Sequence, residues 1–473
     1  MDPKEKCLFI NSITPKGGLF TGKKEEIHPD CNTSWRISPE PFWLLPEELE
    51  WFEELGRHLY NFYRACNTLY SQSYRGIQPT WVSEYLDKGK PEELISYGRM
   101  NRFKSHLPMV IRPDIIPTDG GMIITELDSV PGGIGFTSNL AQQYAQLNYD
   151  VVGCANGMLR GFAEMMRSLA KNEMPNIAIV VSDESADYWD EMVWLSGELR
   201  KLCVAAYTVK PNEIIFTEDG LWLAPLSRGG QGGGRIDVLY RFFELFDLKN
   251  IPKTELIMYS AKKRNVVVTP PFKAYLEEKL LLALLQHPAL KSFWLKEMGE
   301  DTYNFLKAII PKSWILDPRE LPPHAVIPDL YIDDIPVNDW NQLTNASQKE
   351  REMVIKPSGF SELAWGSHGV SVGHDLSSVD WGAAIENALN SFEQTPYILQ
   401  KFHSGKIFLA EYYDFYTDSM VRMNGRVRLC PYYLVVNNKP RLSGILATIC
   451  PADKKILHGM VDAIMVPCAV LPG

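Results

Sequence analysis

The sequence predicts an α+β protein that contains a small lobe of alternating strands and a helix. Between residues 175 and 245, the segments NIAIVVSDES, ADYWDEMVWLSGELRKL and CVAAYTVKP follow one another as a buried strand, an amphipathic helix and a second strand, which is the pattern of a βαβ unit. The last portion of the chain is rich in strands instead: REMVIKPSGF, TPYILQKFHSG, RVRLCPYYLVV and RLSGILATIC. This combination predicts open sheets with helices packed behind them.

The remaining elements follow from apolar spacing and from turn residues. Apolar side chains recur at helical spacing in four stretches, residues 46–74, about 137–147, 151–170 and 271–288. Two strands flank the Gly-Gly turn within 111–133, and 213–223 has the pattern of a hairpin with an Asp-Gly turn. The proline-rich stretch 318–336 is expected to cross the surface.

Size and charge limit the function classes. The chain has 473 residues and a net charge of −10, so its overall field disfavours nucleic acid and anionic membranes as partners. No stretch approaches the ~20 apolar residues of a membrane span, and the N-terminus does not have the pattern of a secretory signal, so we expect a cytoplasmic protein. The eight cysteines are scattered without a C-x-x-C pair, which favours reduced thiols over a disulfide or metal framework.

A charged motif interrupts the first predicted hairpin. The stretch IRPDIIPTDGGMIITELDSVPGG places Arg112 and Asp114 in one apolar strand, and Glu126 and Asp128 in the next. Residues two apart on a strand face the same side, and Mg²⁺ prefers carboxylates together with phosphate oxygens and water. Asp114, Glu126 and Asp128 are therefore candidate magnesium ligands. The alternative is a solvated strand face or a salt bridge to Arg112.

A lysine and a glycine-rich loop form a candidate phosphate site later in the chain. In VIKPSGFSELAWGSHGVSVG, Lys356 ends a buried strand. The loop that follows contains Gly359, Gly366, Gly369 and Gly373. A strand lysine can reach phosphates as a fixed charge, and a glycine loop can donate backbone N–H groups to them. The P-loop pattern GxxxxGK[ST] is absent, and an ordinary strand ending beside a hairpin is the alternative.

The strand YILQKFHSG is a candidate for contact with a nucleotide base. It ends in Gln400 and Lys401, and its backbone groups could meet the edge of an adenine. An ordinary buried strand that runs into a turn explains the same residues equally well.

The order of these motifs resembles that of the ATP-grasp amide synthetases of the glutathionylspermidine synthase type, relatives of eukaryotic glutathione synthetase in fold. The counterparts are RPD (Arg112, Asp114), ELD (Glu126, Asp128), LYRFFELF (Glu244), EKLLLALL (Lys279), VIKPSGF (Lys356) and YILQKF (Gln400). The resemblance covers residues 100 to 450 approximately. The family's Glu-x-Asn is Glu-x-Asp here, which is still a hard oxygen ligand. Its Thr-Pro-Thr-Ser segment, which touches glutathione, is replaced by VPGGIGFTS.

The resemblance implies an ATP-grasp-like fold of the glutathione synthetase type and an ATP-dependent ligase that forms an amide through an acyl phosphate. ATP and Mg²⁺ would be the cofactors, with Asp114, Glu126 and Asp128 on the metal. Arg112 would stabilise charge on the transferring phosphoryl group, and the loop 359–373 would close as a lid. The nucleotide would be held by Lys279, Lys356, Gly359, Gly366, Gly369, Gln400 and Lys401.

Four ranges of the chain are expected to differ in role. They are a helical segment (1–100), the strands and helices of the metal and substrate site (101–174), a Rossmann-like substrate lobe (175–250) and an ATP-grasp nucleotide-binding portion with the glycine-rich lid (251–473).

Residues for the substrates are weaker candidates, and each has an alternative explanation. Gly132 and Gly133 leave room for a backbone-bound acid, or form a turn only. Glu191, early in the βαβ helix, could bind a substrate ammonium, although acidic residues are also common at helix starts. Arg441 could bind a carboxylate or the γ-phosphate, or be a surface arginine. The expected partners are a small carboxylate and an amine, from among amino acids, peptides and polyamines, and the loops that would select them cannot be interpreted from one chain.

Two other functions remain open on the sequence. A two-lobed nucleotide-sugar glycosyltransferase is suggested by the βαβ lobe and the glycine loops, but it would not need an acidic trio beside Arg112. An inactive ATP-grasp scaffold that only binds would need neither the complete trio nor both Lys279 and Lys356.

Overall fold

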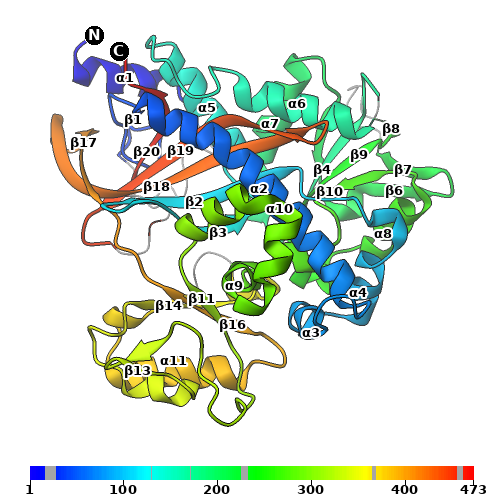
Figure 1. Ribbon diagram of the computed structural model, residues 1–473. Helices are drawn as coiled ribbons and strands as arrows, with labels where there is room; N and C mark the ends of the chain where they lie inside the picture. The colour runs from blue at the N-terminus through cyan, green and yellow to red at the C-terminus, as the bar shows by residue number, and fades with distance from the viewer. Residues whose placement is uncertain are drawn as a thin grey trace.

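The computed structural model describes residues 1–15, 28–128, 130–170, 172–224, 233–364, 369–454, 457 and 462–472. Three larger sheets and two small ones are surrounded by helices (Figure 1). The part that carries α11 and β11–β16 lies at the bottom of the view in Figure 1. No helix in the described ranges is long and apolar enough to cross a membrane.

The largest sheet has seven strands and joins both ends of the chain. Its order is β1-β20-β19-β18-β2-β3, and β17 pairs with the first part of β18. The strands are β1 (Phe42–Leu44), β2 (Val110–Thr118), β3 (Gly121–Asp128), β17 (Ile407–Asp414), β18 (Ser419–Val436), β19 (Lys439–Pro451) and β20 (Ile464–Val470). Leu429 of β18 lies opposite Ile115 of β2, so the last part of the chain supports the hairpin that carries the charged motif.

Helices cover both faces of this sheet. Tyr433 and Leu434 are adjacent on β18, so their side chains point to opposite faces. The hydroxyl of Tyr433 donates to the carbonyl of Phe52 in α2 (2.6 Å), whereas Leu434 lies against Gly161 of α6. The helices of this part are α1 (Pro3–Ile13), α2 (Pro46–Ser73), α3 (Trp81–Asp87), α5 (Ile134–Ala145), α6 (Gly157–Ala170) and α10 (Lys291–Ile309). Helix α4 (Glu92–Gly98) packs in the apolar cluster of the parallel sheet instead.

The predicted βαβ unit belongs to a parallel sheet of four strands, in the order β10-β9-β4-β5. Its strands are β4 (Ile177–Val181), β5 (Ala206–Val209), β9 (Val238–Phe242) and β10 (Val267–Thr269), and its helices are α7 (Trp189–Lys201) and α8 (Thr254–Lys263). The strand β10 therefore lies beyond residue 250, where the Rossmann-like lobe was expected to end. A small sheet of β6 (Ile214–Thr217), β7 (Gly220–Leu223) and β8 (Gly234–Arg235) contains the predicted hairpin at an Asp-Gly turn.

The third sheet carries the predicted phosphate lysine. Its order is β11-β16-β14-β15, and helix α11 (Ser378–Asn390) packs on β14. The strands are β11 (Ser313–Leu316), β14 (Met353–Pro357), β15 (Ser371–Val372) and β16 (Tyr397–Lys401). The strands β12 (Tyr331–Ile332) and β13 (Ile335–Pro336) form a separate ribbon, and Ile332 packs in the same apolar cluster as this sheet. In the antiparallel pair of β14 and β16, Lys356 lies opposite Ile398.

The helix predicted over 271–288 is wrong in its first half. The chain forms a 3₁₀ turn at Ala274–Leu276, and α9 spans only Leu280–Gln286. The residues between them, Glu277 to Lys279, are three consecutive charged side chains, and each is held by a partner in a different part of the fold. Tertiary ion pairs thus outweigh the local helical pattern.

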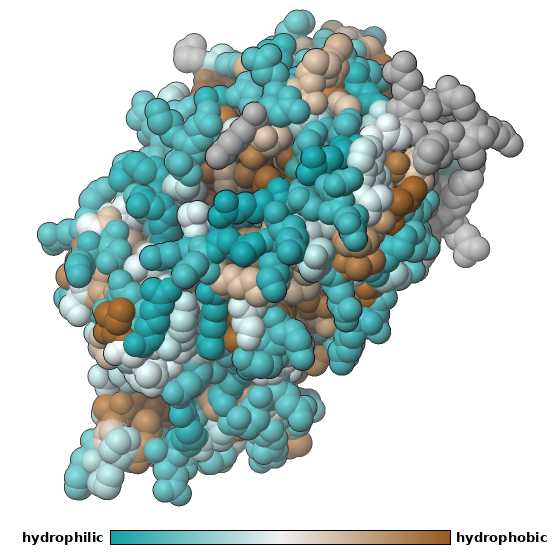
Figure 2. Space-filling model, turned by 90° about the vertical axis from the view of Figure 1, so that its right-hand side faces the viewer, coloured by the Kyte–Doolittle hydropathy of each residue, from teal (hydrophilic) through white to brown (hydrophobic). Residues whose placement is uncertain are grey.

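Hydrophilic residues predominate on the face of the molecule that Figure 2 shows, and hydrophobic residues occur there in small separate groups. Within the described ranges, one large cluster of buried apolar residues joins the seven-stranded sheet to α2, α5, α6, α9 and α10.

Candidate functional site

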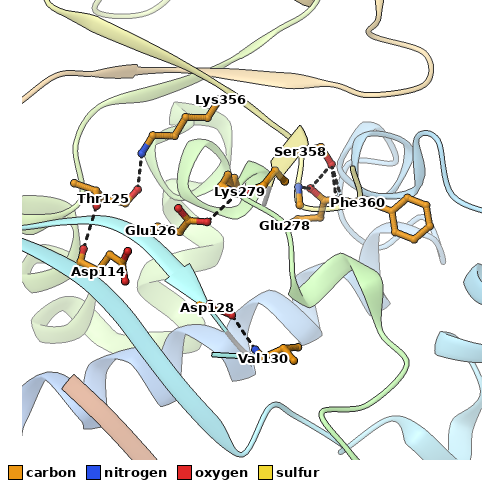
Figure 3. Close-up of polar contacts among 12 residues, drawn as sticks. Asp114, Thr125, Glu126, Asp128, Val130, Glu278, Lys279, Lys356, Ser358 and Phe360 are labelled. Atoms are coloured by element: carbon orange, nitrogen blue, oxygen red, sulfur yellow. Dashed lines mark hydrogen bonds and ion pairs between the residues drawn. The ribbon is translucent and has the colours of Figure 1, made fainter. Parts of the chain in front are cut away.

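The β2–β3 hairpin brings the four residues of the charged motif onto one face. Arg112 lies opposite Asp128, and Asp114 lies opposite Glu126, with an irregularity in the register directly after Asp114. Because residues two apart on a strand share a face and opposite residues lie side by side, the four side chains project from the same face of the hairpin. Figure 3 shows the three carboxylates along it.

Arg112 links two of these carboxylates. Its Nη2 atom lies 3.1 Å from Oδ1 of Asp114 and 3.0 Å from Oδ2 of Asp128. The second oxygen of Asp114 lies 3.1 Å from Nη1 of Arg428 in β18. Burial acts to raise the pKa of Asp114, but the charges of Arg112 and Arg428 outweigh it and hold that pKa below its ordinary value. Asp114 is therefore an ionised carboxylate fixed between two guanidinium groups.

Lys279 connects the hairpin to α9 and to the glycine-rich loop. Its Nζ atom lies 2.8 Å from Oε1 of Glu126 and donates to the carbonyl of Ala364 at 3.3 Å. Burial opposes its charge, yet Glu126 and other nearby carboxylates keep its pKa above the ordinary value. This lysine thus remains a cation beside the acidic residues.

Lys356 reaches the hairpin from the third sheet. Its Nζ atom donates to the carbonyl of Thr125 (2.9 Å) and to Oε1 of Gln400 (2.8 Å), as Figure 3 shows for Thr125. The amide of Gln400 donates in turn to Ser313 of β11. Burial lowers the pKa of Lys356 to about 8, although the charge of Glu126 acts to raise it. Its partners among the described residues are neutral oxygens, so a phosphate would meet it without breaking an ion pair.

A small cleft beside the hairpin is strongly acidic. Its volume is about 70 Å³, and its lining includes Glu126, Asp128, Glu244, Glu277 and Lys279. Burial, followed by repulsion from Glu277 and Asp128, raises the pKa of Glu244 above its ordinary value. Burial also raises the pKa of Glu277 against the pull of Arg241, with which it pairs. Four carboxylates with a single lysine in the lining would bind a divalent cation favourably. We call this space the acidic cleft.

The predicted magnesium trio is only partly brought together. Glu126 and Asp128 line the acidic cleft, whereas Asp114 does not and is held by its two arginines. Across the described ranges, three ligand atoms come within 4.8 Å of one another in Glu54, His58 and Asp301, and not in the trio. In that other group a guanidinium already occupies the centre, because Arg57 contacts both Glu54 (2.8 Å) and Asp301 (3.0 Å).

The start of the glycine-rich loop is held by a buried carboxylate rather than left free for phosphates. Glu278 accepts from the hydroxyl of Ser358 at 2.6 Å (Figure 3). It also accepts from the N–H of Gly359 (3.1 Å) and pairs with Lys90. A Cβ atom on Gly359 would lie 1.9 Å from the carbonyl oxygen of Glu277, so close packing requires glycine there.

The structure says less about the other two glycines that were predicted to bind phosphate. The N–H of Gly369 donates to the carbonyl of Leu363 at 2.9 Å. Gly366 lies outside the described residues.

The candidate substrate residues near the hairpin bond to one another. The buried carboxylate of Glu191 accepts from the N–H groups of Gly133 (3.1 Å) and Gly135 (2.8 Å), so its oxygens are occupied at the start of α5. Burial raises its pKa to about 7. The carbonyl of Gly132 accepts from the hydroxyl of Tyr432 (2.7 Å). These residues therefore hold the turn after β3.

Two predicted site residues lie outside the cluster. Arg441 of β19 pairs with Glu164 of α6 at 2.6 Å, and both side chains are about half exposed. Lys401, at the end of β16, is also exposed, and neither residue lines the acidic cleft. The explanation of Arg441 as a surface arginine fits this position.

Sequence reasoning missed three contributors: Arg428, Glu277 and Glu278. The consecutive Glu-Glu-Lys ending in Lys279 was a usable signal, because adjacent charges in an apolar segment require partners. Arg428 carried no local signal, since it lies 314 residues from the carboxylate that it contacts.

Comparisons with known proteins show the fold of this chain but do not show a family to which it belongs. No family model matches the chain, and no curated protein matches it. A solved glutathione synthetase-like effector from Globodera pallida superposes with a TM-score of 0.52 at 8% identity, over 92% of this chain and 90% of that one. A protein described as a γ-glutamylcysteine synthetase from Methylobacillus flagellatus has a TM-score of 0.40 at 10% identity, over 78% of this chain and 82% of that one. The chain has a glutathione synthetase-like fold.

Proposed function

We propose that this protein is an ATP-dependent ligase that joins a carboxylate to an amine through an acyl phosphate. The observation that carries the proposal is the meeting of cations from three distant segments with one hairpin that already carries Arg112. Lys279 contacts Glu126, Arg428 contacts Asp114, and Lys356 contacts the carbonyl of Thr125. Such a meeting in a glutathione synthetase-like fold supports phosphoryl-transfer chemistry, which depends on positioning and charge neutralisation.

The acidic cleft fits a magnesium ion. Its four carboxylates crowd one another, and the raised pKa values of Glu244 and Glu277 reflect their burial and mutual repulsion. Glu126 and Asp128 would hold the ion, with Glu244 and Glu277 in the same lining. The ion would supply neutralisation of charge on phosphate oxygens.

The cations beside the cleft would contact the anionic reactants. Lys356 is free of an ion pair in the described ranges and is available to a phosphate. The Nε atoms of Arg112 and Arg428 are buried without a hydrogen-bond partner, which leaves donors for an oxyanion. Because unmet buried donors are costly, an anion beside these arginines would lower the free energy of the site.

The chemistry would proceed in two steps. A carboxylate oxygen of the acid attacks the terminal phosphorus of ATP, the bond to the bridging oxygen breaks, and ADP and an acyl phosphate result. The amine then attacks the acyl carbon, loses a proton, and inorganic phosphate leaves with its bonding pair as the amide forms. Arg112 would stabilise the charge on the transferred phosphoryl group and on the tetrahedral oxyanion. The loop after Lys356 would exclude water that hydrolyses the acyl phosphate.

Phosphate release from Mg-ATP tests the proposal. The protein is incubated with Mg-ATP and pools of amino acids, small peptides or polyamines, the class of small carboxylates and amines that we propose as substrates. We expect a pool that contains both an acid and an amine to stimulate release at least tenfold over ATP alone. ATP binding without stimulated release under any pool would contradict the ligase proposal.

A second candidate is a nucleotide-binding protein without turnover. The observation in its favour is that Asp114, Glu126 and Asp128 each already contact a protein cation. The same assay separates the two candidates, since a binding protein would give a measurable ATP affinity and no product. The nucleotide-sugar transferase rested on the βαβ lobe and the glycine loops, and a glutathione synthetase-like fold accounts for both.

A further inference from the structure

A cavity of about 590 Å³ lies along the edge of the four-stranded parallel sheet. β10 is the end strand of that sheet, and residues 266–269 line one side of the cavity. Tyr60 of α2, the end of α6 (168–170) and the segment 105–109 line other sides. No residue in the lining of the acidic cleft also lines this cavity, so the two spaces are separate.

The charged side chains of this lining are all basic. They are Arg102, Arg264 and Lys273, with the imidazole of His106 beside them, and the lining holds no aspartate or glutamate among the described residues. Arg102 and Arg264 are exposed, and they also line an adjoining hollow together. Lys273, by contrast, is only 2% exposed. The charges therefore extend from the opening of the cavity to its interior. We call this space the basic cavity.

Lys273 is a buried cation with neutral partners. Its Nζ atom donates to Oδ1 of Asn67 (2.8 Å) and to the carbonyls of Lys104 (3.3 Å) and His106 (2.8 Å). Burial lowers its pKa to about 7. A buried charge without a counter-charge raises the free energy of the fold, so an anion in the cavity would stabilise the protonated lysine.

The positive charges of Arg264 and Lys273 reach the same part of the basic cavity, because both act on His106. Burial lowers the pKa of His106, and the charges of Lys273 and Arg264 lower it further. Arg264 also has a left-handed backbone (φ 64°) at the end of α8, where glycine or asparagine is the usual residue. A long basic side chain at such a position places a guanidinium at the opening of the cavity at some cost in backbone energy.

We propose that the basic cavity is a second binding site, which takes a small molecule with two anionic groups, carboxylate or phosphate. One group would contact Arg102 and Arg264 at the opening. The other would lie inside, near the positive charge of Lys273, whose three N–H donors are already taken by Asn67, Lys104 and His106. The spread of positive charge over two positions favours a dianionic ligand over a single small anion. The proposal is independent of the ligase proposal, because it involves neither the acidic cleft nor ATP.

Titration calorimetry with succinate and with inorganic phosphate tests the site on the full chain at pH 6.5. We expect saturable binding of one succinate per chain, and affinity at least tenfold lower in Arg264→Asn and in Lys273→Met. Asparagine suits the left-handed backbone of Arg264, so this change removes the charge without adding strain. Lys263→Asn is the matched control, because it removes one exposed positive charge from the neighbouring position, which does not line the cavity. Its affinity for succinate should equal that of the unmodified protein.

Three results would overturn the proposal. In the first, neither succinate nor phosphate binds saturably. In the second, Arg264→Asn and Lys263→Asn lower the affinity for succinate equally. In the third, Arg264→Asn binds succinate with the affinity of the unmodified protein. The last result would place the anion elsewhere, for example at Lys356. Thermal unfolding checks that each variant folds, and Arg102→Gln replaces Lys273→Met if the buried substitution prevents folding. A Lys356→Met variant that loses ATP turnover but keeps succinate affinity would separate the two sites.

Discussion

The ammonium of Lys356 lies 2.8 Å from Oε1 of Gln400, and both side chains are buried. Its second acceptor is the carbonyl of Thr125, so the described partners of this cation are neutral. A buried cation among neutral oxygens is unfavourable until an anion arrives. The relationship therefore marks the position in the proposed active site at which a phosphate would contribute most to binding.

Removing this cation should weaken nucleotide binding. We expect Lys356→Met to lower the affinity for Mg-ATP at least tenfold, measured by calorimetry, because it removes the charge that the phosphate would meet. Lys296→Met, on the exposed face of α10, should leave the affinity unchanged. Equal affinities in the two variants would exclude Lys356 from the nucleotide site.

The affinity of the unmodified protein should also depend on pH. Burial lowers the pKa of Lys356 to about 8, so the free protein holds the ammonium form below pH 8 and loses it above. Affinity for ATP should therefore fall between pH 7.5 and 9, by up to tenfold per pH unit above the pKa. This decrease should be absent in Lys356→Met.

The carboxylates of the acidic cleft should be essential for turnover and dispensable for folding. We expect Glu126→Gln and Asp128→Asn to lower the rate of phosphate release about 10²–10³-fold, since each removes an oxygen ligand of the proposed magnesium ion. Circular dichroism should show an unchanged fold. Glu164→Gln, which removes a carboxylate on α6 that pairs with Arg441, should keep full activity. Normal rates in both cleft variants would remove the metal assignment.

Gly132 should be required for packing. A Cβ atom there would lie 2.1 Å from the ring of Tyr188, which no side chain tolerates without movement. We expect Gly132→Ala to lower the free energy of unfolding by about 1–3 kcal/mol, the usual cost of overpacking, in urea denaturation. In a protein that already carries Tyr188→Ala, Gly132→Ala should lower the free energy of unfolding by less than it does in the unmodified protein, because the ring that it would meet is gone. An additive effect of the two changes would contradict the contact.

Glu191 should make stability depend on pH. Burial raises its pKa from 4.5 to about 7, so the folded protein retains this proton after the unfolded chain has lost it. Stability should therefore fall as pH rises from 4.5 to 7, by about 3 kcal/mol for this group alone. Glu191→Gln lacks the titration, so the difference in free energy of unfolding between variant and parent should shift in the variant's favour between pH 5 and pH 8. A constant difference over that interval would contradict the raised pKa.

Local patterns predicted much of the fold. The helix expected over 46–74 is confirmed as α2 (Pro46–Ser73), and the βαβ pattern is confirmed as β4, α7 and β5. Both depend on the spacing of apolar residues within one segment, which a sequence displays directly. The glutathione synthetase-like fold is confirmed as well.

Contacts between distant segments could not be predicted in the same way. The helix predicted over 271–288 was wrong in its first half, because the charged residues of 277–279 find partners far along the chain, and was confirmed in its second half as α9. The phosphate role of Gly359 stays a prediction, and its contact with Glu278 had no local signal in the sequence. The roles of Arg112, Lys279 and Lys356 also stay predictions. Arg112 lies in the hairpin, and the structure places the two lysines beside it.

Because β18 pairs with β2, the ribosome makes the hairpin long before it makes the strand that covers the hairpin's edge. Arg428 is added 314 residues after Asp114, and at roughly 5–20 residues per second a ribosome needs roughly 15–60 s for that distance. Throughout this interval the nascent hairpin has an uncovered strand edge and an aspartate without its second guanidinium. A chain released before residue 419 would keep that edge permanently, so prematurely terminated products are expected to self-associate and to depend on chaperones.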